Sequence, residues 1–140
     1  MNASQRFAVS LHILTLLASS DAPMTSEAIA ASVDTHPVVI RRTMANLREH
    51  GLVESKPGAN GGWRLLRKPG KIGLREVYCM LHHEDVLAIH GHPNKKCPVG
   101  SHIKETLSDI FSSAQAEMEN ALDQYTVADV LKDVMARGGK

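Results

Sequence analysis

Apolar residues between positions 25 and 50 recur three and four positions apart, which is the spacing of one face of an α-helix. A first short helix is predicted after Thr25, whose side chain can accept from the unpaired amides of the first turn. It ends before a turn at 34–35. A second helix is predicted from Pro37, with His36 as its cap, because the missing N–H of proline has no intrahelical partner at that position. Together the two form a helix-turn-helix.

The second predicted helix has one apolar side and one polar side. Ile40, Met44 and Leu47 are four and three positions apart and are expected to face the core. The opposite face is basic, small and polar, and it carries Val38, Arg42, Ala45 and Asn46, with Arg41 and Arg48 beside it. A helix with such an outward face is suited to the major groove of DNA.

A β-hairpin is predicted directly after these helices. The segments 52–53 and 63–65 flank the glycine-rich stretch 60–62, and glycine is favoured in tight hairpin turns. The order helix, turn, helix, hairpin is that of a winged helix-turn-helix, in which the hairpin is the wing.

The remaining pattern predicts helices over 5–19, 74–82 and 98–125, and one from Thr126 to about Met135. In the helix over 98–125, apolar residues alternate at intervals of four and three, which is the rhythm of a coiled coil. These residues are Leu107, Phe111, Ala114, Met118, Ala121 and Tyr125. Such a stripe is typical of an oligomerisation element, so we expect a twofold dimer. The core helix of a monomer is the alternative.

The expected fold class is mainly α with a small β-hairpin, a winged helix-turn-helix followed by a long C-terminal dimerisation helix. Three regions are expected: a DNA-binding domain over 1–71, a connecting helix and sensor loop over 72–97, and the dimerisation and terminal helices over 98–140. With 140 residues and 43% hydrophobic content, the chain can bury one core without disulfides. No apolar run approaches the roughly 20 residues that span a bilayer, and the first residues lack a signal-peptide layout, so a cytoplasmic location is expected.

Charge is concentrated in the predicted recognition helix and wing. The whole chain has a net charge of +1, but eight basic residues between 36 and 71 face only Glu49 and Glu54. The eight are Arg41, Arg42, Arg48, Lys56, Arg64, Arg67, Lys68 and Lys71. A patch of this kind binds phosphate, so we predict binding to double-stranded DNA. The alternative is a winged-helix module with a solvated basic face that binds protein and not DNA.

The predicted DNA contacts have different roles. Arg41, Arg42 and Asn46 are the candidate base readers, because arginine pairs with guanine and asparagine with adenine. Other residues are predicted to contact phosphates, and the wing is predicted to contact the minor groove or its backbone. Ser26, His36 and Lys56 are expected to hold phosphates, Asn60 and Arg64 to act from the wing, and Pro37, Val38, Gly61 and Gly62 to lie against the DNA. Two copies on a twofold axis would read a palindromic operator.

Several motifs resemble the Rrf2 family of bacterial transcription regulators, nearly from end to end. They are MTSEAIA from Met24, PVVIRR from Pro37, LREHGLV from Leu47, GANGGWRL from Gly58 and CPVG from Cys97. The resemblance implies a homodimeric winged helix-turn-helix repressor whose long helices cross at the dimer interface, and the CPVG variant is most similar to the YwnA-like branch. Known members sense iron-sulfur status, nitric oxide, redox state or cysteine metabolism. The resemblance also places Arg41 at a base-reading position of a relative, but the residue type differs there, so no sequence preference transfers.

The loop before the long helix holds the candidate sensor. Iron-sulfur regulators of the family carry three closely spaced cysteines there, whereas residues 91–100 hold only Cys97, so we expect no 2Fe-2S cluster and no other cofactor. Cys97 precedes a predicted helix start and follows two lysines, and both features favour the reactive thiolate. Cys97 with His92 and His102 is the candidate redox or effector sensor. A thiol that only caps and packs is the alternative.

Histidines leave metal sensing as a further alternative. His82, His83, His90, His92 and His102 lie with Cys97 in residues 82–102, and all can bind a borderline metal. Their spacing fits no standard zinc finger, so no metal is assigned. Cys97 near His92 or His102 is also the one candidate for nucleophilic catalysis, but the chain has no phosphate-binding loop or paired-carboxylate motif. We therefore expect that the protein is not an enzyme.

Overall fold

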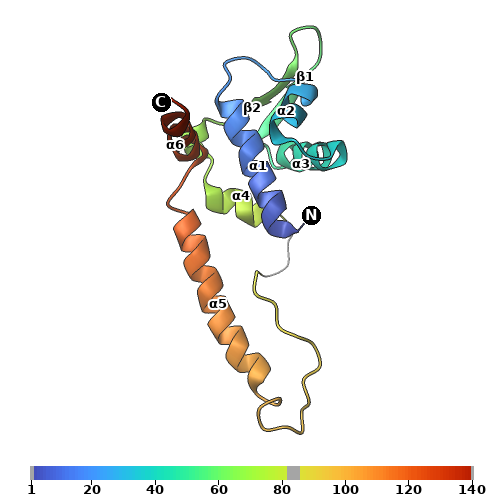
Figure 1. The fold of residues 1–140 in the computed structure, drawn as a ribbon, viewed down its shortest axis with the longest axis vertical. Helices are drawn as coiled ribbons and strands as arrows, with labels where there is room; N and C mark the ends of the chain where they lie inside the picture. The colour runs from blue at the N-terminus through green and yellow to red at the C-terminus, as the bar shows by residue number, and fades with distance from the viewer. Residues whose placement is uncertain (1, 82–85, 140) are drawn as a thin grey trace.

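The computed structural model describes residues 2–81 and 86–139 (Figure 1). The helices are α1 (Ala3–Ala18), α2 (Ser26–Val33), α3 (Pro37–Glu49), α4 (Leu74–Met80), α5 (Ile103–Leu122) and α6 (Val127–Gly138), with the short 3-10 helix η1 (Pro69–Lys71). Strands β1 (Val53–Lys56) and β2 (Gly62–Leu65) pair antiparallel. The predicted class, mainly helical with one small hairpin, is confirmed.

Local side-chain caps explain where the helices start. The Oγ1 atom of Thr25 accepts from the backbone N–H of Ala28 at 3.1 Å and begins α2. At the start of α6, Thr126 and Asp129 each accept from the other's backbone N–H, which forms a capping box. The predicted starts of α2, α3 and α6 are confirmed, because each depends on residues within a few positions of the helix end.

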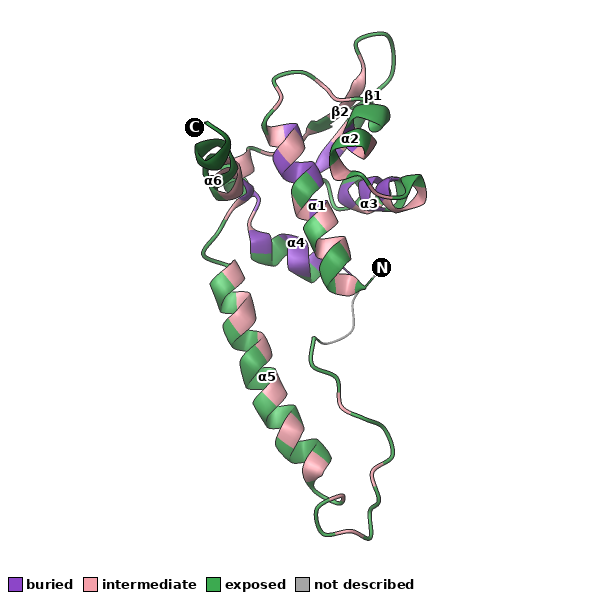
Figure 2. Ribbon diagram, in the orientation of Figure 1, coloured by how far each residue is buried: buried purple, intermediate pink, exposed green. Residues whose placement is uncertain are grey.

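The hydrophobic core lies around α1. Ile13, Leu14 and Leu17 of α1 pack with Ile29 of α2 and Leu47 of α3. Figure 2 shows the buried positions gathered in the upper part of the molecule, where α1 is flanked by the wing, α3, α4 and α6. Burying one such side chain contributes about 1.5 to 3 kcal/mol relative to leaving it exposed. This cluster therefore holds α3 and the wing in a fixed orientation. None of the described helices has the length and apolar content needed to cross a membrane.

Helix α5 extends away from this core (Figure 1). It contains no buried residue, and its main packing partner is the short helix α4. Of the predicted stripe, Leu107, Phe111 and Met118 are half-buried, whereas Ala114 is exposed. Tyr125 lies beyond the end of the helix at 122, because the chain turns there to meet α4. The N–H of the first residue of α4 donates to the carbonyl of Tyr125 at 3.0 Å.

The predicted start of the long helix at Pro98 is wrong. The helix starts at Ile103, and residues 95–102 form consecutive turns and a bend. Within them the N–H of Ser101 donates to the carbonyl of Cys97 at 2.8 Å. That bond has the spacing of an α-helix, but the N–H of His102 donates to the carbonyl of Val99, three positions back, at 3.1 Å, which is the spacing of a turn.

Helix α6 returns to the winged body and packs against α1 and η1. Its first residue, Val127, is fully buried, and the N–H of Val127 donates to the carbonyl of Ile72 at 2.9 Å. The helix continues to Gly138, beyond the end predicted near Met135. The C-terminal helix is therefore anchored at its start by both packing and backbone hydrogen bonding.

Candidate nucleic-acid interface

Helix α3 has one face in the core and the other in solvent. Ile40, Met44 and Leu47 are buried, as their spacing predicts. Arg41 and Arg42 are exposed, and within the described part of the chain neither guanidinium has an ion pair or hydrogen bond with a protein group. Two extended cations are therefore available to an external acceptor. Asn46 and Val38 are half-buried, and Pro37 is exposed at the first turn of the helix.

The turn before α3 fixes the direction of that helix. Asp34 has a φ of 53°, and its N–H donates to the carbonyl of Ala30 at 2.8 Å, which closes α2. The Nδ1 atom of His36 then accepts from the N–H of Val38 at 3.2 Å and caps α3. In this tautomer the proton of the neutral ring is on Nε2. The predicted phosphate contact of His36 would therefore have to use Nε2–H.

The wing is a short hairpin whose tip is residues 57–61. Lys56 is paired with Gly62 at the base of the tip, and Lys56 and Asn60 are both exposed. A Cβ on Gly61 would lie 2.0 Å from the carbonyl oxygen of Lys56. Gly62 has a φ of 142°, and its Cβ would lie 2.6 Å from the carbonyl oxygen of Met24. The sequence predicted both glycines as DNA contacts, and the structure gives each a separate role in the backbone of the wing.

Trp63 ties the wing to both helices of the helix-turn-helix. Its indole N–H donates to the Oγ of Ser26 at 3.1 Å, at the start of α2. The guanidinium of Arg48, at the end of α3, lies 5.7 Å from the ring centroid in a cation–π contact. The backbone of Trp63 also exchanges two hydrogen bonds with Met24.

Sequence reasoning missed the roles of Trp63 and Arg48. The sequence feature that could have indicated both roles is an aromatic residue directly after the glycine-rich tip, together with a cationic residue near the end of the preceding helix. The same contact changes the prediction for Ser26, because its oxygen already accepts from the indole. The hydroxyl hydrogen of Ser26 is the group that it can offer to a phosphate.

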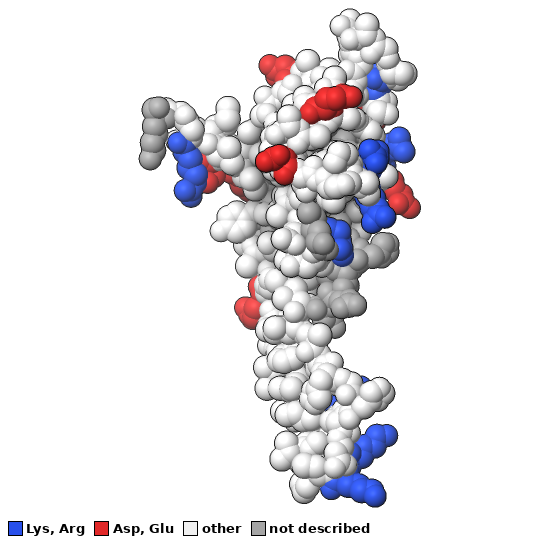
Figure 3. Space-filling view, turned by 45° about the vertical axis from the view of Figure 1, so that its right-hand side comes forward, with Lys and Arg blue, Asp and Glu red and all other residues white. Residues whose placement is uncertain are grey.

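The basic patch is narrower than the sequence indicates. Arg64 forms an ion pair with Glu54, its cross-strand neighbour in the hairpin. Arg67 turns to Glu76 of α4, where its Nη1 donates to Oε1 at 3.1 Å, and this hydrogen bond raises the pKa of Arg67. Figure 3 shows Lys and Arg side chains gathered along one side of the upper body, with acidic groups mainly elsewhere on that body. Exposed pairs are worth at most about 1 kcal/mol, so a phosphate could still compete for Arg64.

Cys97 lies at the bend within the segment 95–102, before the start of α5. Hydrogen bonds from the backbone of Gly100 and Val99 lower the pKa of the Cys97 thiol. One of the two predicted causes, a helix start at Pro98, is therefore wrong, although the predicted direction of the pKa shift agrees. Among the described contacts, no hydrogen bond joins Cys97 to His92 or His102. The structure does not bring the three candidate sensor residues together as one bonded group.

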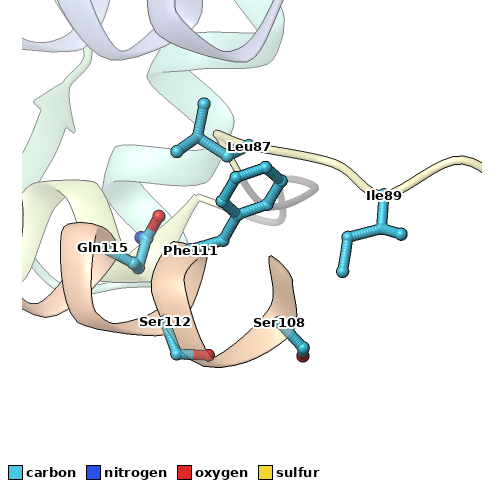
Figure 4. A pocket seen from close by; sticks show the side chains of 6 residues that line it. All are labelled: Leu87, Ile89, Ser108, Phe111, Ser112 and Gln115. Atoms are coloured by element: carbon cyan, nitrogen blue, oxygen red, sulfur yellow. The ribbon is translucent and has the colours of Figure 1, made fainter. Parts of the chain in front are cut away.

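A pocket of about 260 Å³ lies between the loop and α5 (Figure 4). Leu87 and Ile89 of the loop line it together with Phe111 and Gln115 of α5. The Nε2 atom of Gln115 donates to the hydroxyl of Tyr78 in α4 at 2.8 Å. The Tyr78 ring in turn meets Phe7 of α1 edge to face, with centroids 5.4 Å apart. Packed groups thus connect the loop side of α5 to the central helix of the winged body.

Cys79 has a different environment on α4. Its Sγ donates to the Oε1 of Glu119 in α5 at 3.5 Å, and Arg75 lies 3.6 Å from the same carboxylate. Burial, followed by the contacts with Glu119, raises the pKa of Cys79. Cys79 therefore favours the unreactive thiol form, in contrast to Cys97.

The helix-turn-helix, the wing and the exposed cations of α3 define a winged-helix transcription regulator. The model of the Rrf2 family, described as iron-dependent transcriptional regulators, matches residues 3–133, and the chain belongs to this family. It is 41% identical over 129 residues to the HTH-type transcriptional regulator YwnA of Bacillus subtilis, across 91% of this chain and 96% of YwnA. The family consists of regulators, so the prediction that the protein is not an enzyme is confirmed.

Two solved structures are similar over most of this chain. One, a DNA-binding protein, is 37% identical with a TM-score of 0.72 and covers 90% of this chain and 98% of its own. The other, a transcriptional regulator from Lactobacillus plantarum, is 27% identical with a TM-score of 0.78, at 92% and 89% coverage.

The description of the family raises the question of iron. The chain has two cysteines, and Cys79 and Cys97 lie on separate elements, one of them bonded to a carboxylate. Within residues 2–81 and 86–139, no three His, Cys, Asp or Glu side chains come together in a group that could hold a metal. Thiolates are the usual ligands of a 2Fe-2S centre, so the described residues of one chain do not fit a cluster. His82 and His83 lie outside the described residues, and the expectation of no cofactor stays a prediction.

Proposed function

We propose that this protein is a homodimeric repressor that binds a palindromic operator in double-stranded DNA. The observation that carries the proposal is the pair Arg41 and Arg42. Both are exposed and have no ion pair or hydrogen bond with any described residue, and they lie on a helix whose other face is buried in the core. A rigid helix with outward cations matches the width and charge of the major groove. A solved structure that is named as a DNA-binding protein and is 37% identical to this chain supports the same conclusion.

The proposed contacts follow the exposure of each side chain. Arg41, Arg42 and Asn46 would read bases from α3. The Ser26 hydroxyl, His36 Nε2–H and the Lys56 ammonium would hold phosphates on either side of the groove. The wing, with Asn60 at its tip and Arg64 on β2, would reach the minor groove or its backbone, and Pro37, Val38, Gly61 and Gly62 would line the surface against DNA.

The proposed dimer would form through α5. This helix is about 30 Å long by its rise of 1.5 Å per residue, and it buries none of its side chains within one chain. Ile110 is 56% exposed, and half-buried apolar residues such as Leu107 and Met118 follow the helix. A second copy would cover this surface and fix the separation of two recognition helices. We propose regions 1–71, 72–97 and 98–140 for DNA binding, sensing and dimerisation.

We propose the loop around Cys97 as the sensor region and the cytoplasm as the location. The lowered pKa of Cys97 and its half-exposed position support reaction with an oxidant or electrophile. The contacts from Gln115 through Tyr78 to Phe7 offer a physical route from α5 to the winged body. His92 and His102 remain candidates for that region, and the effector is not assigned.

A gel-shift titration against the protein's own upstream DNA, repeated over a series of salt concentrations, tests the DNA-binding proposal. We expect saturable binding that weakens steeply as salt rises, because phosphate contacts release counterions. Protein prepared without oxygen and assayed with and without oxidant tests the sensor separately. A winged-helix module that binds only protein would give no salt-sensitive shift at any concentration, and that result would refute the proposed function.

A further inference from the structure

An apolar groove of about 500 Å³ lies between α1, α6 and the end of α2. Figure 1 shows α6 on one side of α1 and the recognition helix α3 on the other. We infer that this groove binds a small, uncharged and largely apolar molecule. The groove includes none of the predicted DNA contacts and no residue of the loop around Cys97, so the inference goes beyond the proposed function.

The groove follows α6 from Val130 to Met135, beyond the buried start of the helix. Its first residue is fully buried and hydrogen-bonded to the body, whereas Val134 is 50% and Met135 is 60% exposed near the other end. Both side chains line the groove, opposite Leu11 and Leu16 of α1. Apolar surface that neither helix covers is therefore concentrated in one concave place.

The residues that line the groove determine which kind of ligand could bind there. None of the eleven lining residues is Asp, Glu, Lys or Arg, so a charged group on a ligand would find no fixed counter-charge. The hydroxyls of Thr15 and Ser19 donate to carbonyls of their own helix at 2.7 and 2.6 Å. The pair His12 and Ser32, joined by a hydrogen bond of 3.1 Å between Nε2 and Oγ, is the polar spot that a ligand could reach.

The size of the groove favours a small molecule over a protein partner. Ligand sites have volumes of about 300 to 1,000 Å³ and combine apolar walls with a few polar groups. A stable protein interface uses about 20 to 30 residues on each side, whereas eleven line this groove. The proposed function places a second copy of the chain on a separate element, α5. The occupant is therefore an alkyl or aromatic molecule with one neutral hydrogen-bonding group.

Fluorescence titration of the full chain with N-phenyl-1-naphthylamine, an uncharged probe that brightens in apolar surroundings, tests the inference. We expect saturable binding to the wild type. Val134→Trp fills the mouth of the groove with a side chain at a half-exposed position that tolerates size, and should weaken binding about ten-fold or more. Ala136→Trp is the matched control, because Ala136 is exposed on the same helix and does not line the groove. It should bind as the wild type does.

Competition and mass measurements complete the test. Decanol should displace the probe about ten-fold better than decanoate, because the lining has no fixed cation for a carboxylate. Equal probe binding by the wild type and Val134→Trp, or stronger competition by decanoate, would overturn the inference. A lower oligomeric mass for Val134→Trp would identify the groove as a protein interface and would also overturn it. DNA binding is measured separately, and its loss or retention does not bear on these outcomes.

Discussion

The winged body and α5 differ in how far their apolar side chains are buried within one chain. In the body, α1 is surrounded by other elements, and residues such as Ile13 and Leu47 are completely buried. In α5, a helix of 20 residues, no side chain is buried at all. Figure 2 shows the contrast between the two parts. The core of the body is buried within one chain, whereas we propose that a second copy of the chain covers the apolar residues of α5. A dimeric regulator needs a rigid surface that contacts DNA and a helix whose apolar side chains can pack against a second copy.

The largest expected effect comes from placing a charge in the predicted stripe of α5. Ala114 is exposed in one chain, so Ala114→Asp should leave the fold of the monomer intact. In a dimer the new carboxylate would be buried without a partner, at a cost of about 3 to 5 kcal/mol. Analytical ultracentrifugation should show monomers, and operator affinity should collapse.

Ser113→Asp is the control for that experiment. Ser113 is also exposed but lies beside the stripe, so the variant should remain dimeric. If Ala114→Asp has the same mass as the wild type, α5 does not pair through this stripe.

Shortening a buried side chain of the body should destabilise the protein far more than shortening an exposed side chain of α5. Leu47 is 0% exposed, and Leu47→Ala should destabilise the protein by about 2 to 5 kcal/mol through lost burial and a cavity. In the Ala114→Asp background, which is expected to be monomeric, Ile110→Ala removes a similar apolar side chain at a position that is 56% exposed in one chain, and should change the free energy of unfolding by about 0.5 kcal/mol or less. Urea unfolding at fixed protein concentration measures both, and comparable losses would contradict the contrast.

Base reading by Arg41 should produce an intermediate effect within the body. Arg41→Ala is expected to cost roughly 1 to 3 kcal/mol on the matched operator and to flatten base preference at the contacted position. Lys56→Ala, a proposed phosphate contact, should weaken binding to all sequences alike and reduce the salt slope by about one. Quantitative gel shifts on operator and random duplexes compare them. An equal loss on both duplexes for Arg41→Ala would remove its reading role.

The smallest expected effect is a difference in reactivity between the thiols of Cys97 and Cys79. The pKa of Cys97 is lowered by backbone hydrogen bonds and that of Cys79 is raised by burial, so the thiolate of Cys97 forms at lower pH. Alkylation by iodoacetamide, followed by peptide mass spectrometry over a pH series, should modify Cys97 first. Glu119→Gln removes the carboxylate beside Cys79 and should lower the pH at which Cys79 reacts. A reversed order in the wild type would contradict the sensor proposal.

Features that depend on neighbouring residues could be predicted from the sequence. The caps at Thr25 and His36, the helix starts and the buried face of α3 each require only a few adjacent positions. The hairpin is likewise predicted by its glycine-rich turn, and the long helix by the spacing of its apolar residues. The fold class and the exposed cations of the recognition helix follow from these features alone.

Features that depend on distant partners could not be predicted. Trp63 meets Ser26 across 37 positions, and Cys79 meets Glu119 across 40. The pairing of Arg67 with Glu76 depends on how η1 turns the chain, so the count of basic residues overstated the patch. The start of α5 was misplaced because Pro98, which suits a first helical turn, equally suits the tight turns that it occupies here.

Hydroxyl-radical footprinting of the dimer on its own upstream DNA tests the central claim most directly. Two recognition helices held by paired copies of α5 should protect two equivalent half-sites, in successive major grooves about 34 to 36 Å apart. A single protected patch, or uniform cleavage at low salt, would contradict the claim that α3 is presented in duplicate to DNA.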